Sequence, residues 1–365
     1  MRYSVSVVGA KDHIRSAVAK AIDLIGWKPP RGERLLIKPN MINAKTSEEG
    51  VTTDPRVVLA LIEIVRAAGE MANVGDSPGN AYPGKAREVF SATGMLDVIR
   101  EGGSVFVEFE GLPPKIVKLN GELLKSIGLA RPIFDYRLIN VPKLKTHVQT
   151  IMTGALKNLA LGCIPGSGKG VIHSVGKTPD RMAKAMVDVY SAIRPLVSLN
   201  VMDAVVCMEG NGPTGGRPLR LGRVLASTDA LALDMVSFAM AGLDPEDVPH
   251  VREASRRSLG PESLEEIDIL GDAFSVVKFE LPSTFFSRVA SFAGSFAPTI
   301  SPSVSFISSK CTGCGNCAEA CPGSAITIQG CAKRDKSKCI KCYVCHEVCE
   351  NGAVRINRSL SRIWP

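Results

Sequence analysis

Two matched runs of four cysteines near the C-terminus constrain this 365-residue chain more than any other feature. Both runs have the spacing C-x2-C-x2-C-x3-C, and they occupy residues 311–321 and 339–349. Thiolates at this spacing hold two [4Fe-4S] clusters, with the fourth cysteine of each run ligating the cluster of the other run. The sequence therefore predicts one cluster on Cys311, Cys314, Cys317 and Cys349, and a second on Cys339, Cys342, Cys345 and Cys321.

A pair of zinc sites is the alternative, because soft thiolates bind zinc as well as iron–sulfur clusters. A single C-x2-C pair would not separate the two, but two matched runs with Pro322 after the first favour clusters. The segment is also an internal repeat, since residues 321–328 match residues 349–356. Glu350 stands where the second run usually has proline; because all eight cysteines are present, we expect altered surroundings of the cluster and not its loss.

Disulfide bonds are the other common use of many cysteines. Nine of the 11 cysteines fall in the last 55 residues, eight of them at the cluster spacing, and residues 1–5 run directly into a strand pattern without a signal sequence. Both observations favour a reducing cytoplasm. A membrane span needs roughly 18 consecutive apolar residues. No stretch of this chain reaches that length, so we expect no membrane insertion.

The formal net charge of +8 suggests nucleic acid as a partner. Eight thiolates and two oxidised cluster cores would lower this charge to about +4. Aromatic residues make up only 5% of the chain, which argues against a surface that stacks on bases. One basic run, at residues 333–338, predicts a solvated face or, as the alternative, a docking patch for an acidic redox partner. We expect a redox partner protein and no nucleic acid.

Strand and helix patterns alternate over most of the chain, which predicts an α/β domain with a mainly parallel sheet and helices on both faces. The expected strands are residues 4–9, 35–37, 71–74, 137–141, 201–207, 221–226, 267–270 and 276–279, and a strand pair at 105–108 and 115–119. The expected helices are residues 14–25, 54–68, 83–92, 150–161, 181–193 and 229–241. We expect three segments: the α/β domain at 1–281, a connection at 282–308 and a small α+β ferredoxin-like domain at 309–365.

Polar residues follow several of these strands. They form the segments Lys38–Asn40, Asp76–Ser77, Lys143–His147 and Glu209–Gly212. Ligands of open α/β sheets bind outside the carboxyl ends of the strands, so these residues indicate one cationic pocket. The alternative is that each is an ordinary polar loop residue.

The residue types predict roles in such a pocket. The anion-binding candidates are Lys38, Asn40, Lys143, Lys145, Lys157 and Asn158, and the catalytic candidates are His147, His173, Asp76 and Glu209. The histidines are expected to carry protons or bind a metal, and the carboxylates to orient groups or bind a metal. Residues 210–215 match G-x-G-x-x-G, but an extended pattern follows instead of the helix that a dinucleotide needs. The sequence leaves open whether an additional metal or a flavin binds, since flavin sites often lack a short motif.

The large domain resembles the family catalogued as domain of unknown function number 362. The resemblance is carried by residues 37–40, 53–55, 75–77, 141–147, 154–158 and 209–213, in this order. It implies one α/β domain bearing a site, often with a C-terminal ferredoxin module, but it supplies no reaction. The cysteine runs separately resemble two-cluster bacterial ferredoxins, which are electron carriers.

The leading hypothesis is an iron–sulfur oxidoreductase whose clusters pass electrons to the cationic site, where an anionic substrate such as a carboxylate or phosphate binds. A non-catalytic electron-transfer or cluster-carrier protein, whose large domain docks a partner, is the alternative. A ligase or transferase with structural clusters is a third possibility. The sequence determines neither the substrate, nor the direction of electron flow, nor the oligomeric state.

Overall fold

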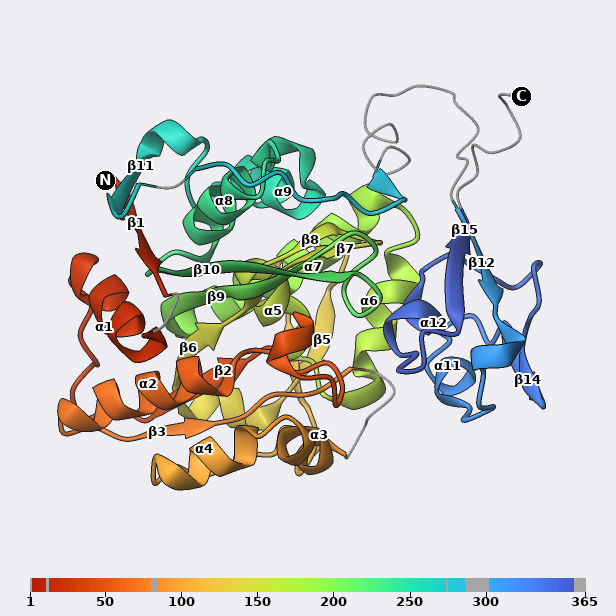
Figure 1. Ribbon diagram of the computed structural model, residues 1–365, viewed down its shortest axis with the longest axis horizontal. Helices are drawn as coiled ribbons and strands as arrows, with labels where there is room; N and C mark the ends of the chain where they lie inside the picture. The colour runs from red at the N-terminus through yellow and green to blue at the C-terminus, as the bar shows by residue number, and fades with distance from the viewer. Residues whose placement is uncertain (1, 11–12, 80–84, 274, 286–301, 358–365) are drawn as a thin grey trace.

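The computed structural model describes residues 2–10, 13–79, 85–273, 275–285 and 302–357 (Figure 1). Its larger part is a nine-stranded mixed sheet with helices on both faces, which confirms the predicted α/β class. The smaller C-terminal part is a module of short strands and helices beside one end of that sheet. We call it the ferredoxin module.

The main sheet has the strand order β11-β1-β10-β9-β6-β2-β3. These strands are β1 (Tyr3–Gly9), β2 (Leu35–Pro39), β3 (Ala72–Val74), β6 (Arg137–Val141), β9 (Val197–Glu209), β10 (Arg217–Ser227) and β11 (Ile267–Gly271). Strands β9, β6, β2 and β3 run parallel, whereas β10 is antiparallel to both β9 and β1. Two more strands, β7 (Lys143–His147) and β8 (Ile151–Thr153), extend the sheet beside the end of β9.

Helices cover both faces of the sheet (Figure 1). One face carries α1 (Ile14–Leu24), α2 (Pro55–Ala67), α3 (Ala86–Ala92) and α4 (Met95–Glu101). The other carries α5 (Ala155–Gly162), α6 (Lys169–Val175), α7 (Pro179–Ile193), α8 (Ala230–Met240) and α9 (Pro249–Arg256). Successive strand residues point to opposite faces, so Leu35 and Ile37 pack in one core and Leu36 in the other.

Three element predictions were wrong. Residues 105–108 do not pair with 115–119; β4 (Lys115–Lys118) pairs with β5 (Ser126–Leu129), and Phe106 forms a bridge to Val74 at the edge of the main sheet. Residues 276–279 lie outside the sheet, because the amides of Val277 and Phe279 donate to the carbonyls that end α8.

The third wrong prediction was a single helix over residues 150–161. Residues 151–153 form strand β8, and the helix begins only at Ala155. The reason is tertiary: the buried carboxylate of Asp234, on α8, accepts from the amides of Ala155 at 2.5 Å and Leu156 at 3.0 Å. A carboxylate at a helix N-terminus satisfies amides that have no partner within the helix.

The ferredoxin module is built from two similar halves. Its strands are β12 (Ser303–Phe306), β13 (Ile326–Gln329), β14 (Cys331–Arg334) and β15 (Val354–Asn357), and its helices are α11 (Asn316–Glu319) and α12 (Val344–Glu347). Strand β12 pairs with β15, and β13 pairs with β14. Strand β12 falls in the segment predicted as the connection, most of which (residues 286–301) lies outside the described residues. The domain boundaries stay a prediction.

Candidate functional site

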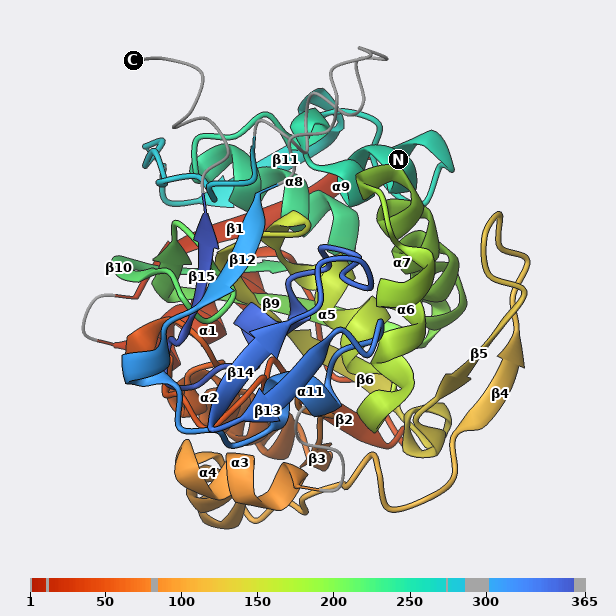
Figure 2. The same ribbon diagram turned by 90° about the vertical axis from the view of Figure 1, so that its right-hand side faces the viewer.

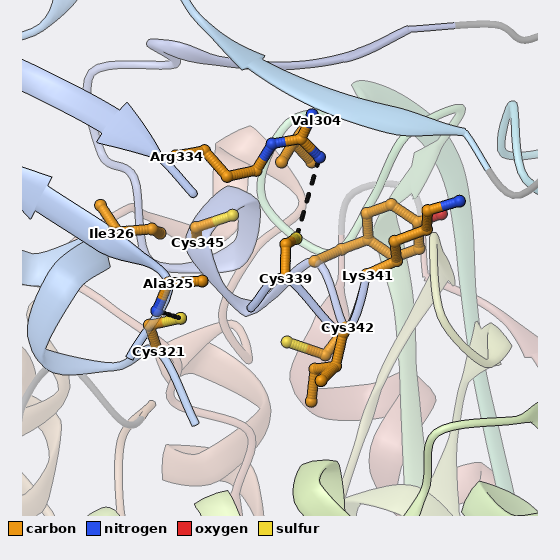
Figure 3. A pocket seen from close by; sticks show the side chains of 11 residues that line it. Val304, Cys321, Ala325, Ile326, Arg334, Cys339, Lys341, Cys342 and Cys345 are labelled. Carbon is orange, nitrogen blue, oxygen red and sulfur yellow. Dashed lines mark hydrogen bonds between the residues drawn. The ribbon is translucent and has the colours of Figure 1, made fainter. Parts of the chain in front are cut away.

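The eight predicted cluster cysteines surround two separate cavities of the ferredoxin module. The first cluster cavity is lined by Cys311, Cys314, Cys317 and Cys349. The second cluster cavity is lined by Cys321, Cys339, Cys342 and Cys345 (Figure 3). The structure thus brings together the two sets of four that the spacing predicted, each with three cysteines from one run and one from the other.

The sulfur atoms in these cavities also accept hydrogen bonds in a repeated pattern. The amide of Ala325 donates to Cys321 Sγ at 3.3 Å, and the amide of Ala353 donates to Cys349 Sγ at 3.2 Å. The two contacts occupy equivalent places in the two halves, although Glu350 replaces the usual proline in the second. Soft thiolates that accept amide hydrogen bonds fit [4Fe-4S] clusters, and such bonds tune their reduction potentials. Each assigned ligand stays a prediction.

A third cavity lies between the α/β domain and the ferredoxin module; we call it the interface cavity. It has a volume of about 70 Å³, which is room for a few water molecules or a small ligand. It is bounded by the loops after β2 and β3, strand β8, helices α5 and α6, and helix α12 of the module. Its lining residues include Asn40, Asp76, Ser77, Thr153, Lys157, Asn158, Lys169, His173, Val344, Glu347 and Val348.

Five of the ten residues predicted for the pocket line this cavity: Asn40, Asp76, Lys157, Asn158 and His173. A sixth, Lys38, lies directly behind it, and its ammonium is 2.7 Å from Asp76 Oδ1. The close approach depends on Gly162, where a Cβ atom would lie 2.1 Å from Lys38 Nζ. Burial raises the pKa of Asp76, although Lys38 opposes that shift.

Lys157 differs from the other buried lysines around the cavity. Its side chain is 8% exposed, and no residue in the described part of the chain forms a hydrogen bond or ion pair with its ammonium. Burial lowers the pKa of Lys157. The carboxylate of Glu347, which lines the same cavity, opposes that shift without forming an ion pair at contact distance. A buried charge normally needs a partner, and the anion-binding role of Lys157 stays a prediction.

A second cation, Lys169, lines the cavity from α6. Its ammonium donates to Ser77 Oγ at 2.5 Å, and Ser77 in turn contacts the carboxylate of Glu110. Burial lowers the pKa of Lys169 to about 8, against the opposing charges of Asp76 and Glu110. Residues 169–175 form α6, which also brings His173 to the same cavity.

The two predicted histidines are both buried and neutral. Burial and the nearby Lys157 lower the pKa of His173 to about 3, and His173 Nδ1 has no hydrogen-bond partner among the described residues. Burial also lowers the pKa of His147. His147 Nδ1 accepts from the amides of Gln149 and Thr150, so the ring proton is on Nε2, which lies 3.3 Å from Glu347 Oε1.

Two predicted lysines are buried next to the site but do not line the interface cavity. Lys143 forms an ion pair of 2.9 Å with Asp203, and both side chains are fully buried. The ammonium of Lys145 donates to the carbonyl of Val51 at 2.5 Å. Both lysines belong to β7, which was predicted as a loop after a strand and is itself a strand of the sheet.

Glu209 is also absent from the lining of the interface cavity. Its carboxylate pairs with Arg217 at 3.0 Å and accepts from the amide of Glu280. The loop after Glu209 does not contribute to the interface cavity either; its polar atoms form hydrogen bonds with the ferredoxin module. The carbonyl of Asn211 lies 3.0 Å from His346 Nε2, and the hydroxyl of Thr214 donates to the carbonyl of Glu347 at 2.9 Å.

Glu347 is the site residue that sequence reasoning missed. It belongs to α12, between Cys345 and Cys349, and it lines the interface cavity although it is far in sequence from the lining residues of the α/β domain. Burial raises the pKa of Glu347 to about 7, opposed by Lys157 and Lys145. A carboxylate between two cluster cysteines was the available signal, but the sequence does not show which surface of the module meets the α/β domain.

No helix in the described part of the chain has the length and apolar character needed to span a membrane.

Comparison with known proteins agrees with a large α/β domain followed by a ferredoxin module. The description "4Fe-4S binding domain" matches residues 304–327 and 332–355, so the module holds two [4Fe-4S] clusters and serves electron transfer. The Thylakoid-associated protein sll1697 of Synechocystis sp. is 35% identical over 236 residues, which cover 64% of this chain and 71% of that protein. The description "Domain of unknown function (DUF362)" matches residues 35–239. The chain belongs to this DUF362 family, and it carries a two-cluster ferredoxin module after the family domain.

Proposed function

We propose that this protein is an iron–sulfur oxidoreductase whose substrate is a small anion bound in the interface cavity. The observation that carries the proposal is the position of α12. This helix holds Glu347 between two predicted cluster ligands, and Glu347 lines the same cavity as Lys157 of α5. A ligand in the cavity would therefore lie beside the clusters, which exchange single electrons.

The charges of the cavity support an anionic ligand. Within the described residues neither Lys157 nor Lys169 forms an ion pair, and Lys169 donates to the neutral hydroxyl of Ser77. The carboxylates of Glu347 and Asp76 line the same cavity and offset part of this positive charge. The ammonium groups of these two lysines would bind a carboxylate or a phosphate. Lys38 and Asp76 form an ion pair with each other, so they would stabilise the cavity wall rather than bind the anion.

Neutral polar groups complete the cavity. Asn40 Oδ1, Thr153 Oγ1 and His173 Nδ1 are buried without a hydrogen-bond partner among the described residues. Buried polar atoms of this kind usually have a partner: a bound anion would accept from Thr153 Oγ1 and from His173 Nδ1 where it carries the ring proton, whereas Asn40 Oδ1 needs a donor such as a hydroxyl of the ligand. His147 Nε2 lies 3.3 Å from Glu347 Oε1 and would stabilise that carboxylate.

The test uses the protein purified without oxygen, with its clusters reduced by dithionite. Small carboxylates and phosphates are added singly, and the melting temperature and the visible absorbance of the clusters are followed. We expect one class of anion to raise the melting temperature and to reoxidise the clusters. Lys157→Met should remove both effects, and Lys118→Met, at an exposed lysine of β4, should change neither.

Two outcomes would contradict the proposal. If no anion in the panel raises the melting temperature, or if Lys157→Met responds like the unmodified protein, the cavity is not an anion site. Clusters that no anion reoxidises, but that exchange electrons with a carrier protein, would support the alternative of a non-catalytic electron-transfer protein. In that case the α/β domain would serve to dock a partner.

A further inference from the structure

We propose that an acidic electron-carrier protein docks on a basic surface of the ferredoxin module, over the second cluster cavity. The basic surface consists of the exposed side chains of Lys333, Lys336, Lys338 and Lys341, and the half-buried Arg334. The proposal goes beyond the substrate site, because it concerns the exchange of electrons with an external protein. It holds whether or not the interface cavity binds an anion.

The basic surface is on the accessible side of the module. Figure 2 shows β13 and β14 in front of the α/β domain, on the side of the module that is turned away from it. Strand β14 carries Lys333 and Arg334, and the loop after it carries the remaining lysines. Helix α12 faces the interface cavity instead. A partner could therefore approach the basic surface without displacing the α/β domain.

The basic surface is connected directly to a predicted cluster ligand. Arg334 Nη1 lies 3.8 Å from Cys339 Sγ, and Figure 3 shows this contact together with Lys341 at the edge of the same cavity. Arg334 and Lys341 both line the second cluster cavity. A protein bound to these cations would thus be held next to the second set of cysteines.

The first cluster cavity has different surroundings. Its lining contains no charged side chain; the polar residues there are Thr312, Asn316 and Asn351. The exposed charges next to it in the sequence are mixed, with basic Lys310 and Arg355 and acidic Glu319 and Glu350. The second cluster cavity is lined by two cations, Arg334 and Lys341, so an acidic partner is attracted more strongly to that side.

The stretch of chain that carries the basic surface contains few acidic residues. Between residues 331 and 341 the one acidic residue is Asp335, whose carboxylate accepts from the amide of Ser337 at 2.8 Å. Lys336 and Lys338 form no ion pair with any residue that the structure describes. Such a field accelerates the encounter with an oppositely charged protein, and the acceleration falls as salt screens it.

An anionic membrane surface is the other class of partner that a basic surface can suit. The features of this surface favour a protein. No large hydrophobic side chain of the described module is strongly exposed, so the surface has nothing to insert into lipid. Its closeness to a cluster ligand also has a direct use in electron exchange and none in lipid binding.

The test measures electron exchange between the cluster-loaded protein and an acidic [2Fe-2S] ferredoxin by anaerobic stopped-flow absorbance. The variant combines Lys333→Glu, Lys336→Glu and Lys338→Glu. A control variant with the same change in net charge combines Lys28→Glu, Lys118→Glu and Lys125→Glu, at exposed lysines of the α/β domain. At low ionic strength we expect the first variant to lower the second-order rate constant by about 10- to 100-fold and to remove its salt dependence.

The control variant should stay within about twofold of the unmodified protein, because steering depends on charge near the contact. Iron content and the electron paramagnetic resonance spectrum establish that both variants keep their clusters. Equal rates for the two variants would overturn the proposal. It would also be overturned if the first variant lost binding to phosphatidylserine vesicles while keeping its rate with the ferredoxin. Lys157→Met should retain the exchange rate, which separates this result from the anion test.

Discussion

Two buried lysines, Lys143 and Lys157, lie close together at the edge of the sheet and differ in whether a carboxylate forms an ion pair with them. Lys143 is fully buried and is paired with the equally buried Asp203. Lys157 is nearly as buried but has no partner within the described residues. Burial alone therefore does not mark a functional lysine; the missing partner does, because an unpaired buried charge is costly unless a ligand binds it.

The largest expected effect comes from removing the partner of Lys143. Asp203→Ala should lower the free energy of unfolding by about 3–5 kcal/mol, since it leaves a buried ammonium unpaired. Urea denaturation of the cluster-loaded protein measures the change. The double variant Lys143→Met with Asp203→Leu serves as the control and should recover most of the loss. A loss below about 1 kcal/mol for Asp203→Ala would mean that the pair is not a stabilising element.

The next effect concerns the pH dependence of anion binding. Burial lowers the pKa of Lys169 to about 8, so its ammonium is present below pH 8 and is lost as the pH rises through that value. The affinity for the bound anion should therefore fall by about tenfold between pH 7 and pH 9. Lys169→Arg should lose less affinity over this interval, because arginine stays protonated. An equal fall in both proteins, measured by isothermal titration, would remove Lys169 from the site.

A smaller effect is expected where the two domains meet. Thr214→Val removes the hydroxyl that donates to the carbonyl of Glu347, and it should lower the free energy of unfolding by about 1 kcal/mol. Ser16→Ala, at an exposed hydroxyl of α1, is the control and should stay within about 0.5 kcal/mol. If urea denaturation gives the same free energy of unfolding for both variants, the contact from Thr214 does not hold α12 in place.

The smallest effect on stability is expected for Lys157→Met, in contrast to Asp203→Ala. Methionine keeps the apolar part of the side chain and removes an unpaired buried charge, so the free energy of unfolding should stay equal or rise by up to about 1 kcal/mol. The same urea denaturation measures it. A loss of several kcal/mol would show that Lys157 has a structural partner, and the comparison with Lys143 would fail.

Local sequence patterns predicted the parts of the fold that depend on neighbouring residues. The alternation of strands and helices predicted the α/β class, and the helix expected over 229–241 is observed as α8, where the Asp229 side chain accepts from the amides of Leu231 and Ala232. The prediction failed where a distant group decides the outcome. Helix α5 starts at Ala155 because Asp234 of α8 caps it, and no local signal near residue 155 contains that information.

The same distinction applies to the candidate site. The polar strand ends indicated Asn40 and Asp76 correctly as neighbours of one cavity, because the carboxyl ends of parallel strands meet at one edge. Lys157, Asn158 and His173, which were predicted from their residue types, line the same cavity. The sequence patterns could not separate these residues from Lys143, Lys145 and Glu209. Whether a lysine faces a cavity, a carboxylate or a carbonyl depends on which distant segment packs against it.

The sequence by itself determined the cluster chemistry, because the spacing of the cysteines is a local property that any fold of the segment must accommodate. It also determined the layered α/β class through the periodicity of its apolar residues. Only the tertiary structure decided that α12 faces the α/β domain, with Glu347 lining the same cavity as Lys157, while the basic surface faces outward. The physical reason is that burial and charge pairing arise from contacts between segments that lie far apart in the sequence.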